Sequence, residues 1–214
     1  FPNGTQALPY TASPAVRGGT TPYSWGIVSG VLPLGLSLDT STGKISGTPQ
    51  ESGNKGFSIE VIDAAGVKTS QWFWIDIRAP LSITTTSFFN GGVNNSYGTS
   101  ARASGGEYPY LWNVTSGTLP PGLALATSSG YLSGLPSSEG VWNFALEVRD
   151  KGGLITTRNF SIEIKPQLKI ILPYFSSSGV VGAPYATSSS AIGGTMPYTW
   201  RISWQTLPPG IILD

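Results

Sequence analysis

Two tryptophans near the middle of the chain are the residues best suited to bind a ligand or a partner. Trp72 and Trp74 are separated by one residue, in a segment whose apolar positions alternate. This alternation is typical of a β-strand with one face inward, so both indoles are predicted on the outer face, about 7 Å apart. Such a pair could stack on a sugar, pack on a partner subunit or cover the joint to a neighbouring domain. Shielding by a local loop or a long side chain is the structural alternative.

Trp204 is a third candidate for a surface interaction. The equivalent positions earlier in the chain hold Ser29 and Ser116, so this aromatic residue is not part of the shared pattern. Tryptophans that do recur at one register are expected in the core, as buried tryptophan contributes a large apolar area. These are Trp25, Trp112 and Trp200.

The composition offers nothing for catalysis. The chain has no His and no Cys, and its 11 acidic residues are scattered. Triads that depend on His, zinc sites of the usual kind and disulfides are therefore excluded. We expect no enzyme activity and no cofactor.

Charge and composition also limit the partners and the fold. A net charge of +1 provides no field for nucleic acid, and no apolar run is long enough for membrane insertion. The chain has 28 Gly, 17 Pro and only 11% charged residues, which argues against helical bundles, while 11% aromatic residues argue against disorder. The composition is typical of an all-β protein outside the cell.

The elements that position these tryptophans belong to an internal repeat. Trp25 and Trp112 are 87 residues apart, and Trp112 and Trp200 are 88 apart. Each tryptophan ends a G-G-x-x-P-Y-x-W motif and is followed by L-P-x-G-(L/I); the motifs begin at Gly18, Gly105 and Gly193. A period this long suits small independent domains joined in tandem.

The repeat register predicts three units: 1–79, 80–166 and 167–214. The first is expected to lack its first strand, the second to be complete and the third to hold only its N-terminal half. We therefore expect this sequence to be part of a longer polypeptide. The predicted joints, around Pro80 and Pro166, are short and contain proline, which stiffens a linker.

Each unit is expected to contain about seven short strands between turns. Phe57, Ile59 and Val61 alternate with other residues, and Gly66 marks a hairpin turn. No segment combines a helical period with caps. The predicted fold class is all-β, with tandem immunoglobulin-like or cadherin-like β-sandwich domains.

These motifs resemble a known family. The series G-G-x-x-P-Y-x-W, L-P-x-G-L-x-L, T-G-x-I-S-G-x-P and F-x-x-x-V-x-D-x-x-G is similar to the immunoglobulin-like repeats of bacterial surface and secreted proteins, which are related to dystroglycan-type cadherin-like domains. The resemblance implies a cadherin-like sandwich used as a stalk, spacer or adhesion module, and it identifies no ligand.

Calcium is possible by this resemblance but is not favoured. Cadherins bind Ca²⁺ at joints with several carboxylates, whereas these joints carry Arg78 and Lys165. Asp63 and Asp150 remain at the hairpin, where they are expected to accept hydrogen bonds from the turn backbone.

The sequence thus predicts a non-enzymatic structural or adhesive array at the cell surface or outside the cell. Its expected partners are other copies of itself, or cell-surface proteins or glycans. The alternatives are a carbohydrate- or protein-binding accessory module of a secreted enzyme, and a viral or phage surface fibre.

Overall fold

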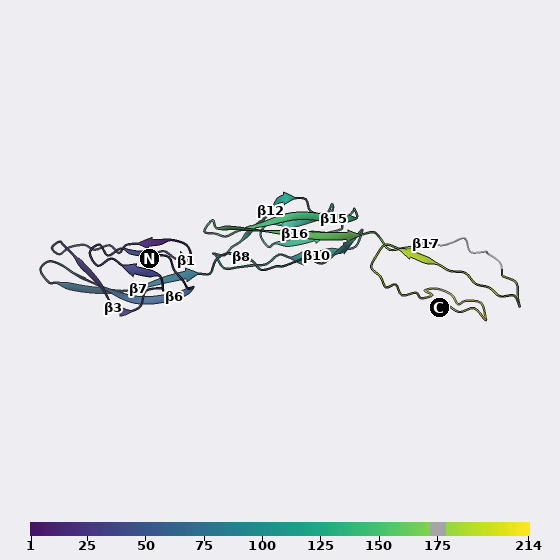
Figure 1. Cartoon of the computed structure of the whole chain (residues 1–214), viewed down its shortest axis with the longest axis horizontal. Helices are drawn as coiled ribbons and strands as arrows, with labels where there is room; N and C mark the ends of the chain where they lie inside the picture. Colours follow the sequence, from purple (N-terminus) through teal and green to yellow (C-terminus); the bar gives the residue numbers. More distant parts are fainter. Residues whose placement is uncertain (172–178) are drawn as a thin grey trace.

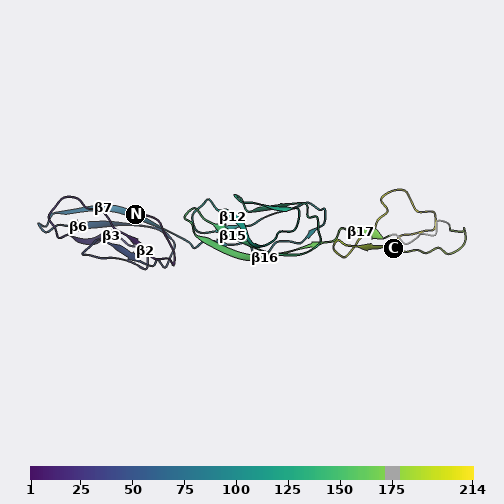
Figure 2. The same ribbon diagram turned by 90° about the horizontal axis from the view of Figure 1, so that it is seen from above.

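The computed structural model describes residues 1–171 and 179–214. All regular elements in these residues are β-strands, as the composition predicted. Figures 1 and 2 show three units arranged end to end along the long axis of the molecule. Within the described residues there is no helix with the length and apolar character needed to cross a membrane.

The first unit, called here the first sandwich, is built from two sheets. One sheet has the order β1-β7-β6-β3 and the other β2-β5-β4. Its strands are β1 (Gly4–Thr5), β2 (Tyr10–Ala12), β3 (Ser24–Gly30), β4 (Leu36–Leu38), β5 (Ile45–Gly47), β6 (Gly53–Ile62) and β7 (Lys68–Arg78).

The second sandwich repeats this arrangement. Its main sheets have the orders β12-β15-β16-β9 and β10-β14-β13, and a small sheet pairs β8 with β11. Its strands are β8 (Ser82–Ile83), β9 (Gly91–Gly92), β10 (Tyr97–Ser100), β11 (Ala103–Ser104), β12 (Leu111–Gly117), β13 (Leu123–Ala126), β14 (Tyr131–Gly134), β15 (Gly140–Arg149) and β16 (Ile155–Lys165). The strand number exceeds the expected seven because the first segment divides into β8 and β9 and β11 forms a two-residue bridge.

The third unit contains β17 (Lys169–Ile171) and β18 (Ser190–Ile192), which pair antiparallel. Residues 172–178 of the third predicted repeat lie outside the described residues. No second sheet packs over Trp200 in the described part of this unit, and its side chain is 36% exposed. The prediction of a core tryptophan is therefore wrong for Trp200, although it is confirmed for Trp25 and Trp112, which are buried.

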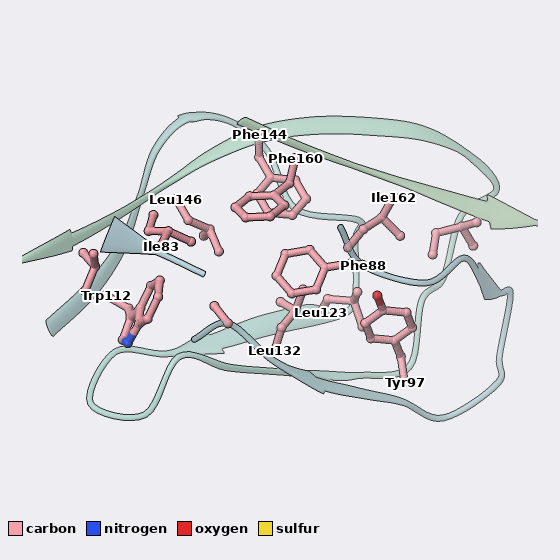
Figure 3. Packing of buried hydrophobic residues seen from close by; sticks show 13 residues of the cluster. Ile83, Phe88, Tyr97, Trp112, Leu123, Leu132, Phe144, Leu146, Phe160 and Ile162 are labelled. Atoms are coloured by element: carbon pink, nitrogen blue, oxygen red, sulfur yellow. The ribbon is translucent and has the colours of Figure 1, made fainter. Parts of the chain in front are cut away.

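Alternating residues of facing sheets form the core of each sandwich. In the second sandwich Phe88, Phe144 and Phe160 pack between the sheets, with Leu132 of the other sheet opposite and Trp112 at one end of the core (Figure 3). Burial of such side chains is the main favourable contribution to folding. Positions one residue away along β7 and β16 therefore face outward, and this sets the direction of Trp72 and Trp74.

Candidate functional site

The outer face of the first sandwich carries an exposed aromatic pair. Trp72 and Trp74 lie on β7 and are 45% and 59% exposed. Their ring centroids are 6.0 Å apart and the ring planes meet at 67°. The outward direction expected from the alternation is thus what the structure has. The rings meet edge to face, so the pair does not form a flat platform.

Small residues on the neighbouring strand position the pair. Gly56 lies opposite Trp74 across the β6–β7 ladder, and Ser58 lies opposite Trp72. A Cβ atom on Gly56 would come within 2.6 Å of the Trp74 ring, so the indole lies directly over this glycine. One side of the Trp74 ring is therefore fixed against the sheet, while the rest of the side chain stays in solvent.

Polar side chains follow the tryptophans along both strands. Asp76 pairs with Asn54 at one end of the pair, and Ser70 pairs with Glu60 at the other. The Arg78 Nε atom lies 3.8 Å from an Asp76 carboxylate oxygen, and the Lys68 Nζ atom lies 3.9 Å from Glu60. The aromatic pair thus has hydrogen-bonding groups at both ends, and each carboxylate has a cation beside it.

The second sandwich has no tryptophan at these positions. Asn159 and Ser161 replace Trp72 and Trp74, and Asn143 replaces Gly56. Asn143, Asn159 and Ser161 line a hollow of about 660 Å³. Since the second sandwich forms the same sheets without the indoles, the aromatic pair is not required by the fold.

Trp204 is 86% exposed and lies in the third unit. The second sandwich separates it from the Trp72–Trp74 pair (Figure 1). The three predicted surface aromatics therefore do not form one site.

The joint between the two sandwiches is a second feature of interest. Arg78 ends β7, and its Nη1 atom donates a hydrogen bond of 2.6 Å to Glu107 of the second sandwich. Lys151 of the following hairpin lies 3.2 Å from the other Glu107 oxygen. The bonds from Arg78 and then Lys151 lower the pKa of the Glu107 carboxyl. The sequence analysis missed this cluster, as its members are separated in the chain.

The Gly-Gly turn of the second sandwich also contacts the joint. Gly106 donates a backbone hydrogen bond of 2.8 Å to the Ala79 carbonyl oxygen. Gly105 has a φ of 75°, and a Cβ atom there would collide with the Pro80 carbonyl oxygen. Glycine is therefore needed at this position both for the backbone conformation and for the close approach.

The next joint repeats these contacts. Gly194 donates a backbone hydrogen bond of 2.8 Å to Pro166, and a Cβ atom on Gly193 would collide with the Gln167 carbonyl oxygen. Lys165, in the position of Arg78, donates to the Thr195 hydroxyl at 3.3 Å. The second and third Gly-Gly turns thus both hold the end of the preceding unit.

A tyrosine and an aspartate form the same hydrogen bonds to this turn in both sandwiches. Tyr110 donates from its hydroxyl to the Gly105 carbonyl oxygen at 2.6 Å, as Tyr23 does to Gly18 at 2.7 Å. Asp150 accepts from the backbone N–H groups of Glu107 and Leu154, both at 2.8 Å. The tyrosine hydroxyl thus fixes the turn to the strand that follows it.

Asp63 has the same role in the first sandwich. Its carboxylate accepts from the N–H groups of Thr20, Ala65 and Val67, and the bond from Thr20 contributes most to lowering its pKa. This confirms the predicted hydrogen bonds to the turn backbone. No cluster of three or more His, Cys, Asp or Glu side chains suited to a metal occurs among residues 1–171 and 179–214.

Fold and joints together define a class: a tandem array of immunoglobulin-like or cadherin-like β-sandwiches. The model of the family described as "Putative Ig domain" matches residues 2–78 and again residues 79–165. The chain belongs to this family.

The "Serine-rich adhesin for platelets" of Staphylococcus aureus strain USA300 is 27% identical over 136 residues, which is 62% of this chain and 6% of the adhesin. The chain thus corresponds to a small part of this relative's length.

Two solved structures are similar to the chain at low identity. Titin fragment I67–I69 has a TM-score of 0.48 and 13% identity, over 78% of this chain and 63% of that one. The extracellular cadherin domains 3–6 of protocadherin gamma B2 have a TM-score of 0.44 and 12% identity, over 77% of this chain and 50% of that one.

Proposed function

We propose that this chain is a stretch of a non-enzymatic, extracellular or cell-surface repeat array that acts as a stalk, a surface fibre or an adhesive filament. In this proposal residues 1–79, 80–166 and 167–214 belong to three successive repeats. The observation that carries it is the joint, where Glu107 and the Gly-Gly turn of one sandwich hold the last strand of the preceding one.

A joint of this kind produces a spacer. Only Ala79 to Leu81 separate β7 from β8, and Ala79 is itself hydrogen-bonded to Gly106. A hinge needs residues that are free to change φ and ψ, and here proline and the turn contacts restrict them. Successive sandwiches therefore keep a fixed orientation relative to one another, and the array holds its two ends at a defined distance.

The low charge and the relatives support a place outside the cell. A rod with short turns and few charged residues resists proteolysis, since cleavage occurs at mobile loop tips. The adhesin match is to a protein whose name describes attachment to platelets. By analogy we expect the partners to be other copies of the chain, or surface proteins or glycans.

The distance between spin labels on the two sandwiches tests the proposal. Because the chain has no Cys, single cysteines at Val67 and Ser138 can be labelled specifically. Val67 is exposed in the β6–β7 hairpin, and Ser138 is exposed beyond β14.

We expect one narrow distance distribution for this pair. The control is a pair within the second sandwich, which reports label mobility without the joint. A distribution for the cross-joint pair that is much broader than that of the control would contradict a stiff spacer.

A further inference from the structure

We propose that the outer face of β6 and β7 in the first sandwich binds a neutral carbohydrate chain through Trp72 and Trp74. The ligand class is a pyranose oligosaccharide with equatorial hydroxyls, whose sugar rings have flat C–H faces and polar edges. The proposal is independent of the spacer function, since it concerns one face of one repeat.

The exposure of the two indoles is the first argument. The second sandwich folds with Asn159 and Ser161 at the same register, so burial or sheet formation does not account for the tryptophans. Two adjacent indoles that remain 45% and 59% exposed keep apolar surface in water, which costs free energy unless something covers it.

The shape of the aromatic pair is the second argument. The residues beside the indoles are small: Gly56 and Ser58 on β6, and Ser29 on β3 in register with Ser58. The two rings touch edge to face, with centroids 6.0 Å apart and planes at 67°. Their free faces therefore point in different directions, which suits a single chain rather than a flat crystalline surface.

The polar rim is the third argument. Ligand sites combine apolar contact with a few polar groups that fix orientation. Here Asn54 and Asp76 stand at one end of the pair and Glu60 and Ser70 at the other. These groups accept and donate hydrogen bonds, as sugar hydroxyls do. Lys68 and Arg78 balance the charge of the two carboxylates, so the rim favours a neutral ligand over a charged one.

A protein partner fits this face less well. A stable interface buries about 1,200–2,000 Å² in total and has an apolar centre. Around the two indoles the outward residues of β6 are polar or glycine, and β3 adds Val28, which is 53% exposed at its bulge, so the apolar patch is small. We therefore take a second copy of the chain as the competing outcome of the experiment.

The test is calorimetric titration with soluble hexasaccharides: β-1,4-linked glucose, β-1,4-linked xylose and α-1,4-linked glucose, with an oligogalacturonide as the anionic comparison. The variant Trp72→Asn with Trp74→Ser carries the residues that the second sandwich has, so its fold is expected to persist. We expect at least one neutral β-linked chain to bind, binding about tenfold weaker for each indole removed, and little binding of the anionic chain.

The second sandwich provides the matched gain-of-function variant. Asn159→Trp, Ser161→Trp and Asn143→Gly together reproduce the pair and its glycine, and we expect this variant of the full chain to bind a second equivalent of the same sugar. No binding of any neutral hexasaccharide, or equal binding by the Trp72→Asn/Trp74→Ser variant, overturns the proposal. Concentration-dependent dimerisation that this variant abolishes, without sugar binding, would instead assign the face to a contact between copies.

Discussion

The strongest test of the joint is a glycine substitution that has its own control in the same chain. Gly18 and Gly105 begin the same turn motif and have nearly the same φ, 77° and 75°. Alanine at either position has to adopt a left-handed conformation, which costs about 1–2 kcal/mol. Nothing lies within 4 Å of a Cβ atom at Gly18, so for Gly18→Ala this is the whole expected loss of folding free energy.

Gly105→Ala is expected to cost more. The new Cβ atom would overlap the Pro80 carbonyl oxygen, so either the turn or the joint has to move. Either movement lengthens the hydrogen bond from Gly106 to Ala79, which contributes about 1 kcal/mol. We therefore expect Gly105→Ala to lose about 1 kcal/mol more than Gly18→Ala, equivalent to a further decrease of about 4–8 °C in the melting temperature of its sandwich.

Calorimetry and the spin-label distance measure the two consequences separately. Gly18→Ala should leave the distance between Val67 and Ser138 labels unchanged, whereas Gly105→Ala should shift or broaden it. Equal decreases in the melting temperatures of the two mutated sandwiches, with an unchanged distance in Gly105→Ala, would refute the view that this turn holds the joint.

Five further outcomes are expected. Glu107→Gln should broaden the cross-joint distance distribution, and the effect should shrink in high salt, which screens exposed ion pairs. Because the Glu107 pKa is lowered in the folded chain, its contribution is fully present above the ordinary value of 4.5 and is lost as pH falls through the lowered pKa, so the wild-type distribution should broaden on acidification. Tyr110→Phe should cost about 1 kcal/mol in denaturant unfolding, since it removes the hydroxyl bond to Gly105. Asp150→Ala should cost about 1–3 kcal/mol in the same assay, because two backbone N–H groups lose their acceptor. Melting temperatures in chelator and in calcium should agree; a rise with calcium would contradict the assignment of Asp63 and Asp150 to turn hydrogen bonds.

The sequence predicted the features that depend on local periodicity. Alternation along β7 was enough to place Trp72 and Trp74 outward, and the spacing of Trp25 and Trp112 was enough to reveal the repeat. Both inferences need only the strand period and the repeat register, which can be read directly from the linear sequence.

The contacts across the joint could not be predicted in this way. Arg78 was noted only as a basic residue that disfavours calcium, and its partner Glu107 occupies a variable position of the turn motif, where Thr20 and Thr195 stand in the other repeats. Pairing them requires knowledge of which loop lies beside the end of β7. The geometry of the aromatic pair was likewise inaccessible, since the position of Trp74 over Gly56 depends on which strand lies beside β7.

The Gly-Gly turn has a consequence for how such arrays change over generations. At both joints the later repeat supplies the turn that contacts the end of the earlier one. Gly105 and Gly106 do so at one joint, and Gly193 and Gly194 at the next. A duplicated or deleted repeat therefore brings or removes its own connector, and the remaining junctions keep their geometry. The array can lengthen or shorten in whole units by recombination, and a binding face on one repeat can be carried to a different distance without redesign of the units between.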